Sequence, residues 1–462
     1  MQPYCFCHFM QFFGVVLQVT RAFGQRAVDK YRELLTMDEL PDENRVEALR
    51  RLYDLLSNQE TKQVAIAHEV LYACVDLAEA RSADVREHSA LALSSIVLFE
   101  PRRVFSPPQT MFCNQDKPDE LANETILRVG GMLLGDREEN VIVAACTIFR
   151  NWSISNEGAA VIVGCEPVVH KLTSMLTGQP IKIIPLPVLG LLLEILANLS
   201  RLHTGAKVNA NYGVIPCLLA VLKKFVLYEP LFVLHGAQTI WNAGVHDQGK
   251  REAISLSAVE ICLKILTRVL SQSYQCNDNK LEVELIRCLM GAVMALSTAE
   301  EAKPLVIEFG VEPLVACLHH PASSIKHNAV IAINSACESP KGIHAFVLRL
   351  LHEEELLVEV FGVKAVVALS RYMKDVDEEE TVSALKATAT LCRTQEGADQ
   401  VIQCLGMLDD MVKLMASNKT LREAAIPVLR NMASHGPSLQ NRVAKCLAKH
   451  HVPEFYQDII MR

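Results

Sequence analysis

Aromatic residues are scarce in this chain. They make up 6% of its 462 residues, with two tryptophans, although half of all residues are hydrophobic. A core built around large rings is therefore excluded, and Ala, Leu and Val must supply most of the buried surface. No long stretch alternates apolar and polar residues with a period of two, so strands are not expected. The composition favours many thin helix–helix layers.

A concentrated charge of one sign is also missing. Lys plus Arg number 45 and Asp plus Glu number 53, and the two signs are interspersed along the chain. The net charge of −8 and the lack of a basic block argue against a nucleic-acid partner. No uncharged apolar run reaches the roughly 20 residues that a membrane span needs. We therefore expect neither a nucleic-acid nor a membrane partner.

The sequence lacks the motifs that carry common catalytic or metal chemistry. It contains no His-Glu-x-x-His, no Gly-x-Ser-x-Gly and no phosphate-binding glycine loop. The paired histidines at 319–320 and 450–451 diverge on a helix, and the acidic run 375–380 lacks the rest of a calcium loop. We predict that the protein is not an enzyme, and that it has no cofactor, metal or small-molecule substrate.

Fifteen cysteines are present, most of them at apolar positions of expected helices. A chain of this length without a secretory signal is not a disulfide scaffold, so buried free thiols and a cytoplasmic location are expected. Residues 1–24 form an apolar N-terminal tail, whose first twenty residues carry no charge. The tail is interpreted as disordered, as an added first helix or as a mistaken translation start.

One short pattern recurs along the chain and consists of a glycine, two residues, a proline and an apolar helix. It occurs at Gly164, Gly213 and Gly310, and in weaker form at Gly362 and Gly406. Ser257 and His451 take the glycine place in two further copies. A left-handed glycine can end one helix, and proline suits the first turn of the next. The pattern therefore predicts repeated turns between helices.

A second pattern, a helix that ends in Asn-x-Ser, alternates with the first. It begins at Asn151 and Asn198, with altered copies at Asn242 and near residues 295, 334, 390 and 431. A repeat of roughly 40–47 residues with two or three helices is typical of armadillo and HEAT proteins. We therefore predict an all-α, right-handed armadillo-type superhelical solenoid of about nine repeats over residues 25–462. Insertions are expected near residues 101–124, 272–281 and 340–356.

The Gly-x-x-Pro turn and the Asn-x-Ser helix end resemble the armadillo family. In that family the third helix of each repeat lines a groove, and its asparagine bonds the backbone of an extended ligand. The resemblance assigns this role to five residues: Asn151, Asn198, Asn242, Asn334 and Asn431. The importin-alpha branch has tryptophan four residues earlier, where this chain has Thr147, Glu194, Gln238, Val330 and Pro427. That departure argues against binding of nuclear signals, and the net acidity argues against a catenin-like basic groove.

Residues 22–56 and 328–347 are similar, more narrowly, to the radial spoke head armadillo proteins of motile cilia. This resemblance implies a structural scaffold in the ciliary axoneme, part of the cytoskeleton, with other subunits of a large assembly as partners. The alternative is a soluble cytosolic adaptor or transport receptor that grips extended peptides.

The repeats between residues 140 and 245 keep the Asn-x-Ser pattern best and contain both tryptophans. Tryptophan is a frequent interface anchor, so the predicted partner-binding groove includes Trp152 and Trp241 beside the asparagines. Two other interpretations remain open. In the first, each tryptophan is a core residue, and in the second, each asparagine only caps its own helix.

Overall fold

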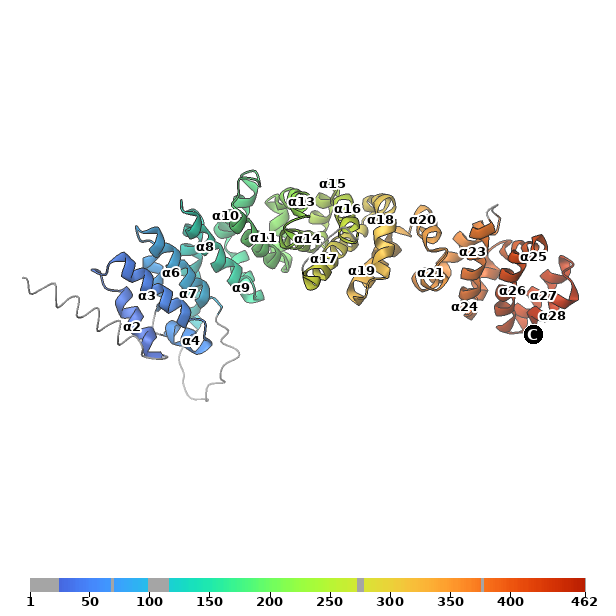
Figure 1. Cartoon of the computed structure of the whole chain (residues 1–462), viewed down its shortest axis with the longest axis horizontal. Coiled ribbons are helices and arrows are strands. Elements are labelled where there is room, and N and C mark those ends of the chain that lie inside the picture. Colours follow the sequence, from blue (N-terminus) through green and yellow to red (C-terminus); the bar gives the residue numbers. More distant parts are fainter. Residues whose placement is uncertain (1–24, 68–69, 99–115, 272–277, 375–377, 462) are drawn as a thin grey trace, which may run out of the picture. The chain divides into compact units, whose positions relative to one another are not determined.

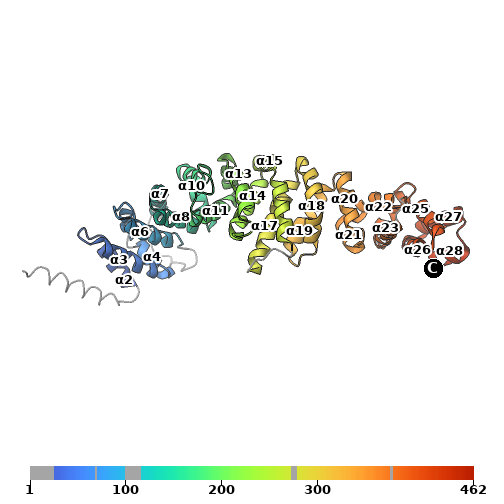
Figure 2. The same ribbon diagram turned by 45° about the horizontal axis from the view of Figure 1, so that its top comes forward.

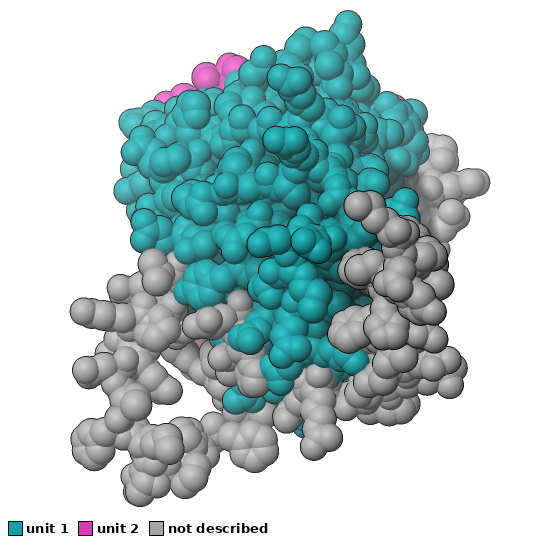
Figure 3. All heavy atoms as spheres, turned by 90° about the vertical axis from the view of Figure 1, so that its left-hand side faces the viewer, with its two compact units in different colours: residues 1–252 teal, residues 253–462 magenta. Residues whose placement is uncertain are grey.

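A computed structural model describes residues 25–67, 70–98, 116–271, 278–374 and 378–461. These residues form helices joined by turns, and they include no strand. The chain divides into two compact units, residues 1–252 and 253–462 (Figure 3). The predicted tail at 1–24 and most of the insertion at 101–124 lie outside the described residues, as does 272–277 of the expected insertion at 272–281. The last residues of the first insertion belong to a helix that begins at Asp116.

Unit 1 contains two rows of stacked helices, seen side by side in Figure 1. The first row, here the asparagine row, comprises α3 (Asp42–Leu55), α6 (Ala83–Ile96), α8 (Glu139–Trp152), α11 (Leu186–Ser200) and α14 (Pro230–Gly244). The second row comprises α5 (Val70–Leu77), α7 (Asp116–Leu133), α10 (Glu166–Thr177) and α13 (Val214–Phe225). Shorter helices join the rows: α9 (Asn156–Gly164), α12 (His203–Asn211) and α15 (Asp247–Ser255). At the N-terminal end, α2 (Gln25–Leu35) packs on α3, α5 and α4 (Gln59–Ala67).

Unit 2 repeats this arrangement (Figure 2). Its asparagine row comprises α17 (Asn279–Ser297), α19 (Ser323–Ala336), α21 (Glu354–Phe361), α23 (Glu378–Leu391), α26 (Lys419–Ser434) and α28 (Glu454–Met461). Opposite them, α16 (Ala258–Val269), α18 (Lys303–Leu318), α20 (Pro340–Leu350) and α22 (Val366–Tyr372) pack in succession. The helix α25 (Met407–Ser417) packs on α27 (Pro437–Lys449), and the remaining short elements are η2 (Glu300–Ala302), η3 (Gly362–Ala365) and α24 (Gln395–Gln403).

Helices inside the asparagine row are buried on more than one side, because each packs on the row helix before it and on the one after it. In α11, for example, Leu189, Leu192, Leu193 and Leu196 are fully buried. A helix that is apolar around most of its circumference is expected to be buried in this way. The all-helical, solenoid-like arrangement predicted from the sequence is thus confirmed.

The predicted turns adopt left-handed backbone at most of their positions. Gly213 has φ of 65°, and Ser257 and His451, the two residues that replace glycine in the pattern, have φ of 61° and 54°. Positive φ also occurs at Gly362 and Gly406. At Gly213 the turn joins α12 to α13, which meet at 87°. The pattern therefore identified a real backbone feature, including its two non-glycine copies.

The prediction of a left-handed turn at the glycine pattern is wrong at two positions. Gly164 is the last residue of α9, and the turn is made by Cys165 with φ of −101° and ψ of 88°. Gly310 lies inside the continuous helix α18 together with Pro313. A side chain at Gly310 would lie 3.4 Å or less from Leu314, Val306 and Leu263, so this glycine provides close packing against α16.

The segment 340–356, expected as a loop inserted into the array, is also helical. It contains α20 and the start of α21, which join the two rows as an additional pair between α18–α19 and α22–α23. Its proline and glycine start a helix: the Ser339 hydroxyl accepts a hydrogen bond from the Gly342 N–H, and Pro340 occupies the first turn. Proline there costs no hydrogen bond.

A third glycine pattern, not predicted from the sequence, closes the tight turn after five of the asparagine-row helices, namely α8, α11, α14, α19 and α23. A Cβ built on any of these glycines would lie 2.0–2.5 Å from the carbonyl oxygen of the residue six positions earlier. The members are Gly158, Gly205, Gly249, Gly342 and Gly397. In three copies a Ser or Thr hydroxyl also caps the following helix by accepting from the glycine N–H. In these three copies the tight turn is therefore marked in the sequence by Ser/Thr-x-x-Gly.

Replacing Ser257 by glycine, the residue that the pattern prefers at this position, should stabilise unit 2. A left-handed residue with a side chain carries a cost of about 1–2 kcal/mol that glycine avoids. We expect Ser257→Gly to raise the stability of unit 2 by about 1 kcal/mol, and Gly213→Val to lower that of unit 1 by more than about 1 kcal/mol. Denaturant unfolding of both variants measures this. If Gly213→Val left the transition unchanged, the strain argument would fail.

A largely buried ion pair links α6 to the turn after α7. Arg86 Nε and Nη2 donate to the two carboxylate oxygens of Asp136 at 2.8 and 2.9 Å, and Nη1 donates to the carbonyls of Ala80 and Arg81. The hydrogen bond from Arg86 is the main cause that lowers the pKa of Asp136. Because the folded pKa is depressed, the pair stabilises the fold above the unfolded value of about 3.9, and this contribution is lost as the pH falls through the folded value.

Asp136→Ala should therefore destabilise unit 1 by about 2 kcal/mol at neutral pH. The difference from the parent should shrink as the pH is lowered below about 4. Urea unfolding at pH 7 and pH 3 measures both values. A difference that is equally large at the two pH values would mean that the carboxylate charge is not its source.

Among the described residues, no single helix is long and apolar enough to cross a membrane. Two pairs of consecutive helices, α9 with α10 and α12 with α13, reach that length and composition only together, and they are bent by 92° and 87°.

Candidate protein-binding surface

The predicted groove residues all lie near the C-terminal ends of helices in the asparagine rows. They are Asn151 and Trp152 on α8, Asn198 on α11, Trp241 and Asn242 on α14, Asn334 on α19 and Asn431 on α26. The pattern therefore located equivalent places in successive repeats. The hydrogen bonds of these residues show how each position contributes to the packing of neighbouring repeats.

Two of the asparagines bond the backbone of the preceding helix in their row. Asn151 Nδ2 donates to the Ser94 carbonyl at 2.9 Å, and Asn431 Nδ2 donates to the Ala389 carbonyl at 2.7 Å. A carbonyl only accepts, so the amide group must face the neighbouring repeat in both cases. These side chains join adjacent repeats, which is neither of the roles foreseen from the sequence.

Two others bond the serine of the preceding Asn-x-Ser copy. Asn198 Nδ2 lies 3.1 Å from Ser153 Oγ, and Asn242 Nδ2 lies 2.9 Å from Ser200 Oγ. Each serine hydroxyl in turn donates to the carbonyl three residues earlier. Both serines are buried, so each hydroxyl needs an acceptor and a donor. The carbonyl three residues earlier is the acceptor, and the asparagine amide of the next copy is the donor.

At α19 the predicted residue is displaced by one position. Ser335, not Asn334, reaches the preceding helix, with its hydroxyl donating to the Ser297 carbonyl at 2.6 Å. The turn glycine confirms this alignment, because Gly342 packs on the carbonyl of Ala336 just as Gly158 packs on that of Trp152. The sequence alignment through Asn334 was therefore shifted by one residue.

The two tryptophans differ in their surroundings. Trp152 is 8% exposed, and its ring and carbonyl pack against Gly158 in the tight turn. It is a core residue, which is the alternative that the sequence left open for both tryptophans. Trp241 is half-buried and stays accessible on α14 beside Asn242.

A polar track crosses the asparagine row of unit 1. Arg150 Nε on α8 pairs with Glu194 on α11 at 2.8 Å, and Arg150 Nη1 also donates to Asn151 Oδ1. His235 on α14 lies next in the track, and burial is the main cause that lowers its pKa. Its Nδ1 is buried without a partner among the described protein groups. The track gives this row a partly polar face.

Five exposed apolar side chains lie in or beside two turns of unit 1, and this set is here called the apolar edge. It consists of Ile183, Leu186, Leu227, Tyr228 and Leu231, each more than half exposed. They lie in or beside the turns that lead from α10 to α11 and from α13 to α14. Because α10 packs on α13 and α11 on α14, these two turns are neighbours.

The apolar edge rests on a rigid base. The Phe225 ring contacts both Tyr228 and Phe232, with centroids 5.4 and 5.2 Å apart. The Phe232 ring in turn packs on Gly190 of α11, where a Cβ would lie 2.9 Å away. Tyr228 is therefore packed against the buried Phe225 ring, and the start of α14 is fixed on α11 through Phe232. The sequence signal was an apolar run around a proline, at 181–188 and 225–232.

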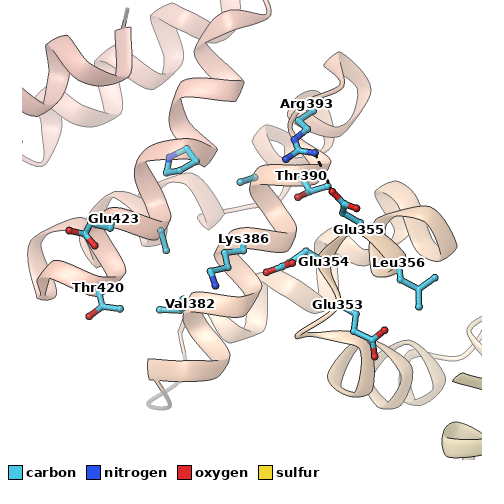
Figure 4. Close-up of a pocket in the computed structure, with 13 residues that line it drawn as sticks. Glu353, Glu354, Glu355, Leu356, Val382, Lys386, Thr390, Arg393, Thr420 and Glu423 are labelled. Carbon is cyan, nitrogen blue, oxygen red and sulfur yellow. Dashed lines mark ion pairs between the residues drawn. The ribbon is translucent and has the colours of Figure 1, made fainter. Parts of the chain in front are cut away.

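Unit 2 has a hollow of about 790 Å³ between α21, α23 and α26 of its asparagine row (Figure 4). Side chains of both charges surround it, including Glu354, Lys386 and Glu423, together with apolar Val382. At its rim Arg393 pairs with Glu355 at 3.9 Å. The Ala389 residue that receives the Asn431 bond also lines it. An open hollow with charged groups and apolar walls suits a peptide segment.

No family model matches this chain. No curated protein matches it either. Among solved structures, it is similar to an engineered protein from the Northeast Structural Genomics Consortium, at 19% identity and a TM-score of 0.57, covering 95% of this chain and 97% of that one. A second engineered protein from the same source has 17% identity and a TM-score of 0.46, covering 58% of this chain and 99% of that one. At such identities the first likeness concerns the fold alone.

Proposed function

We propose that the protein is a non-catalytic scaffold that binds other proteins, and that its main contact is the apolar edge of unit 1. The observation that carries this proposal is the gathering of five large, exposed apolar side chains on two neighbouring turns. Contiguous apolar patches are costly to leave in water and typically mark interaction sites. Tyrosine with surrounding leucines is also a frequent composition of binding hot spots.

We further propose that the repeats are of armadillo type, about nine in number, and wind as a right-handed superhelix. In its support, a short helix, a sharp turn near 90° and two longer helices recur through α9–α11 and α12–α14. The pair α20–α21 departs from this module because it has no short helix of its own. An experimental structure of the full chain tests the type, number and hand of the repeats.

The narrower proposal places the scaffold in the radial spokes of the ciliary axoneme. It rests on the resemblance of residues 22–56, of which 25–35 and 42–55 form α2 and α3. The test is co-sedimentation of the purified chain with demembranated axonemes from cells that lack the protein. Saturable binding that a radial-spoke-deficient axoneme does not show would support the proposal. Equal sedimentation with both kinds of axoneme would reject it.

A soluble adaptor that grips extended peptides is the second candidate, and the hollow in unit 2 favours it. Its mixture of Glu and Lys side chains and apolar walls can hold a peptide in an extended form. Lys386→Glu reverses a charge in this hollow and leaves the apolar edge unchanged. If this variant lost its partners while variants of the apolar edge kept them, the adaptor would replace the scaffold as the preferred function.

A further inference from the structure

Three potential metal ligands meet at the C-terminal end of unit 2. Asp409 lies in the first turn of α25, and Cys446 and His450 lie at the end of α27. His450 Nε2 is 2.8 Å and Cys446 Sγ is 3.7 Å from the same oxygen, Asp409 Oδ1. All three ligand atoms lie within 4.8 Å of one another. Because Cys446 and His450 are four residues apart, they face the same side of the helix end.

The spacing of these atoms is close to that of a tetrahedral zinc site. Zinc binds sulfur at about 2.3 Å and nitrogen or oxygen at about 2.0–2.2 Å, so neighbouring ligand atoms lie roughly 3.3–3.7 Å apart. The Cys446 to Asp409 separation of 3.7 Å lies at the upper end of this range, and the His450 to Asp409 separation of 2.8 Å is shorter because the two atoms share a hydrogen bond. Rotation of the His450 and Asp409 side chains away from each other would place an ion between the three ligands. An imidazole, a thiolate and a carboxylate favour zinc over calcium or magnesium, which prefer oxygen ligands.

The surroundings also suit a cation. The end of α27 presents its negative dipole end to the cluster. Asp409 Oδ1 accepts hydrogen bonds from Lys449 Nζ and His450 Nε2, so this oxygen already faces positively polarised groups. His450 is partly exposed, which leaves a path for an ion and a water ligand. Cys446 is buried, so its thiol is protected from bulk solvent.

Lys449 is the competing occupant. Its Nζ lies 2.7 Å from Asp409 Oδ1, where it balances the carboxylate charge. Its side chain is 66% exposed, so it can turn into solvent at little cost when an ion takes its place. The four-residue cluster is thus fully paired without metal and can be converted into a site by moving one flexible side chain.

We infer that Asp409, Cys446 and His450 form a zinc-binding site that clamps α25 to α27. On binding, the thiol of Cys446 loses its proton to solvent, and zinc forms bonds to that sulfur, to His450 Nε2 and to Asp409. The fourth position takes water. The consequence is a cross-link within the last repeats, independent of the apolar edge and of the proposed function.

Cobalt titration of the full, metal-stripped chain tests this inference, because cobalt bound to a thiolate gives a charge-transfer absorption that zinc does not. We expect one tight site, displaced by zinc, and a higher melting temperature of the chain when zinc is present. Cys446→Ser should abolish the charge-transfer band. Asp409→Asn and His450→Gln should weaken binding at least about tenfold.

Three further variants keep the test decisive. Cys404→Ser removes a partly exposed thiol outside the cluster and should leave binding unchanged. Lys449→Met removes the competing cation and should tighten zinc binding, whereas a simple hydrogen-bond network would gain no affinity. His450→Cys keeps a full ligand set and should retain binding even if His450→Gln unfolds. If Cys446→Ser bound cobalt with the same band as the parent, or if Lys449→Met bound zinc no more tightly, the site would not exist as proposed.

Discussion

Replacing Gly205 by alanine is expected to destabilise unit 1 by about 3 kcal/mol, the upper part of the range for overpacked positions. The added methyl group would lie 2.1 Å from the Leu199 carbonyl oxygen and 3.3 Å from the Val163 side chain. A carbonyl at the end of α11 cannot retreat without breaking the turn into α12. The helix pair must therefore separate, which also disturbs the hydrogen bond that Asn242 makes to Ser200.

Gly164→Ala is the matched control for Gly205→Ala. This glycine also lies in a short helix between rows, but a Cβ there has no heavy atom within 4 Å and its φ is negative. We expect its unfolding free energy to change by less than about 0.5 kcal/mol, or to rise, because alanine favours helix. Chemical denaturation of both variants gives the comparison. Equal stability of the two would show that the tight turn is not essential.

The second large effect is expected at the apolar edge. Tyr228→Ser combined with Leu231→Ser should weaken binding of the partner assembly by about 30-fold or more, the effect of losing a hot spot worth at least about 2 kcal/mol. Both side chains are more than half exposed, so their removal should change the stability of the free chain by under about 0.5 kcal/mol. Quantitative co-sedimentation with axonemes measures the binding, and a thermal melt measures the stability.

Leu405→Ser serves as the control for the edge variants. This leucine is 95% exposed and belongs to unit 2, so its replacement removes apolar surface of the same kind without changing any residue of the apolar edge. Parent-like binding is expected. An equal loss of binding in Leu405→Ser would point to general stickiness of exposed apolar residues, and the apolar edge would then have no special role.

The repeated turns could be predicted because backbone conformation constrains residue type strongly. A left-handed position selects glycine, and even the replacements Ser257 and His451 were found from their place in the pattern. The prediction failed at Gly310, where glycine is required by close packing of Leu263 and not by φ. Glycine can be needed for a left-handed backbone or for the space that its missing side chain leaves, and the sequence alone does not distinguish the two reasons.

The asparagine pattern identified equivalent helix ends but not their chemistry. The spacing of Asn and Ser could be seen, whereas the partner of each amide lies 42–57 residues away in the chain and becomes known only from the packing. At α19 the pattern was aligned one residue too early, at Asn334, although Ser335 makes the hydrogen bond to the preceding helix. The apolar edge was missed because apolar residues beside a proline resemble those of any buried helix start.

Cross-linking tests most directly whether the apolar edge of unit 1 holds the protein in its assembly. Lys182, Lys223 and Lys224 adjoin the apolar edge in sequence, whereas Lys386 lines the hollow in unit 2. Amine-reactive cross-linking of the full chain bound to axonemes, followed by mass spectrometry, should give cross-links to axonemal subunits mainly from the first three lysines. Tyr228→Ser with Leu231→Ser should remove them. Cross-links to partner subunits that arise only from Lys386, and persist in that variant, would contradict the account.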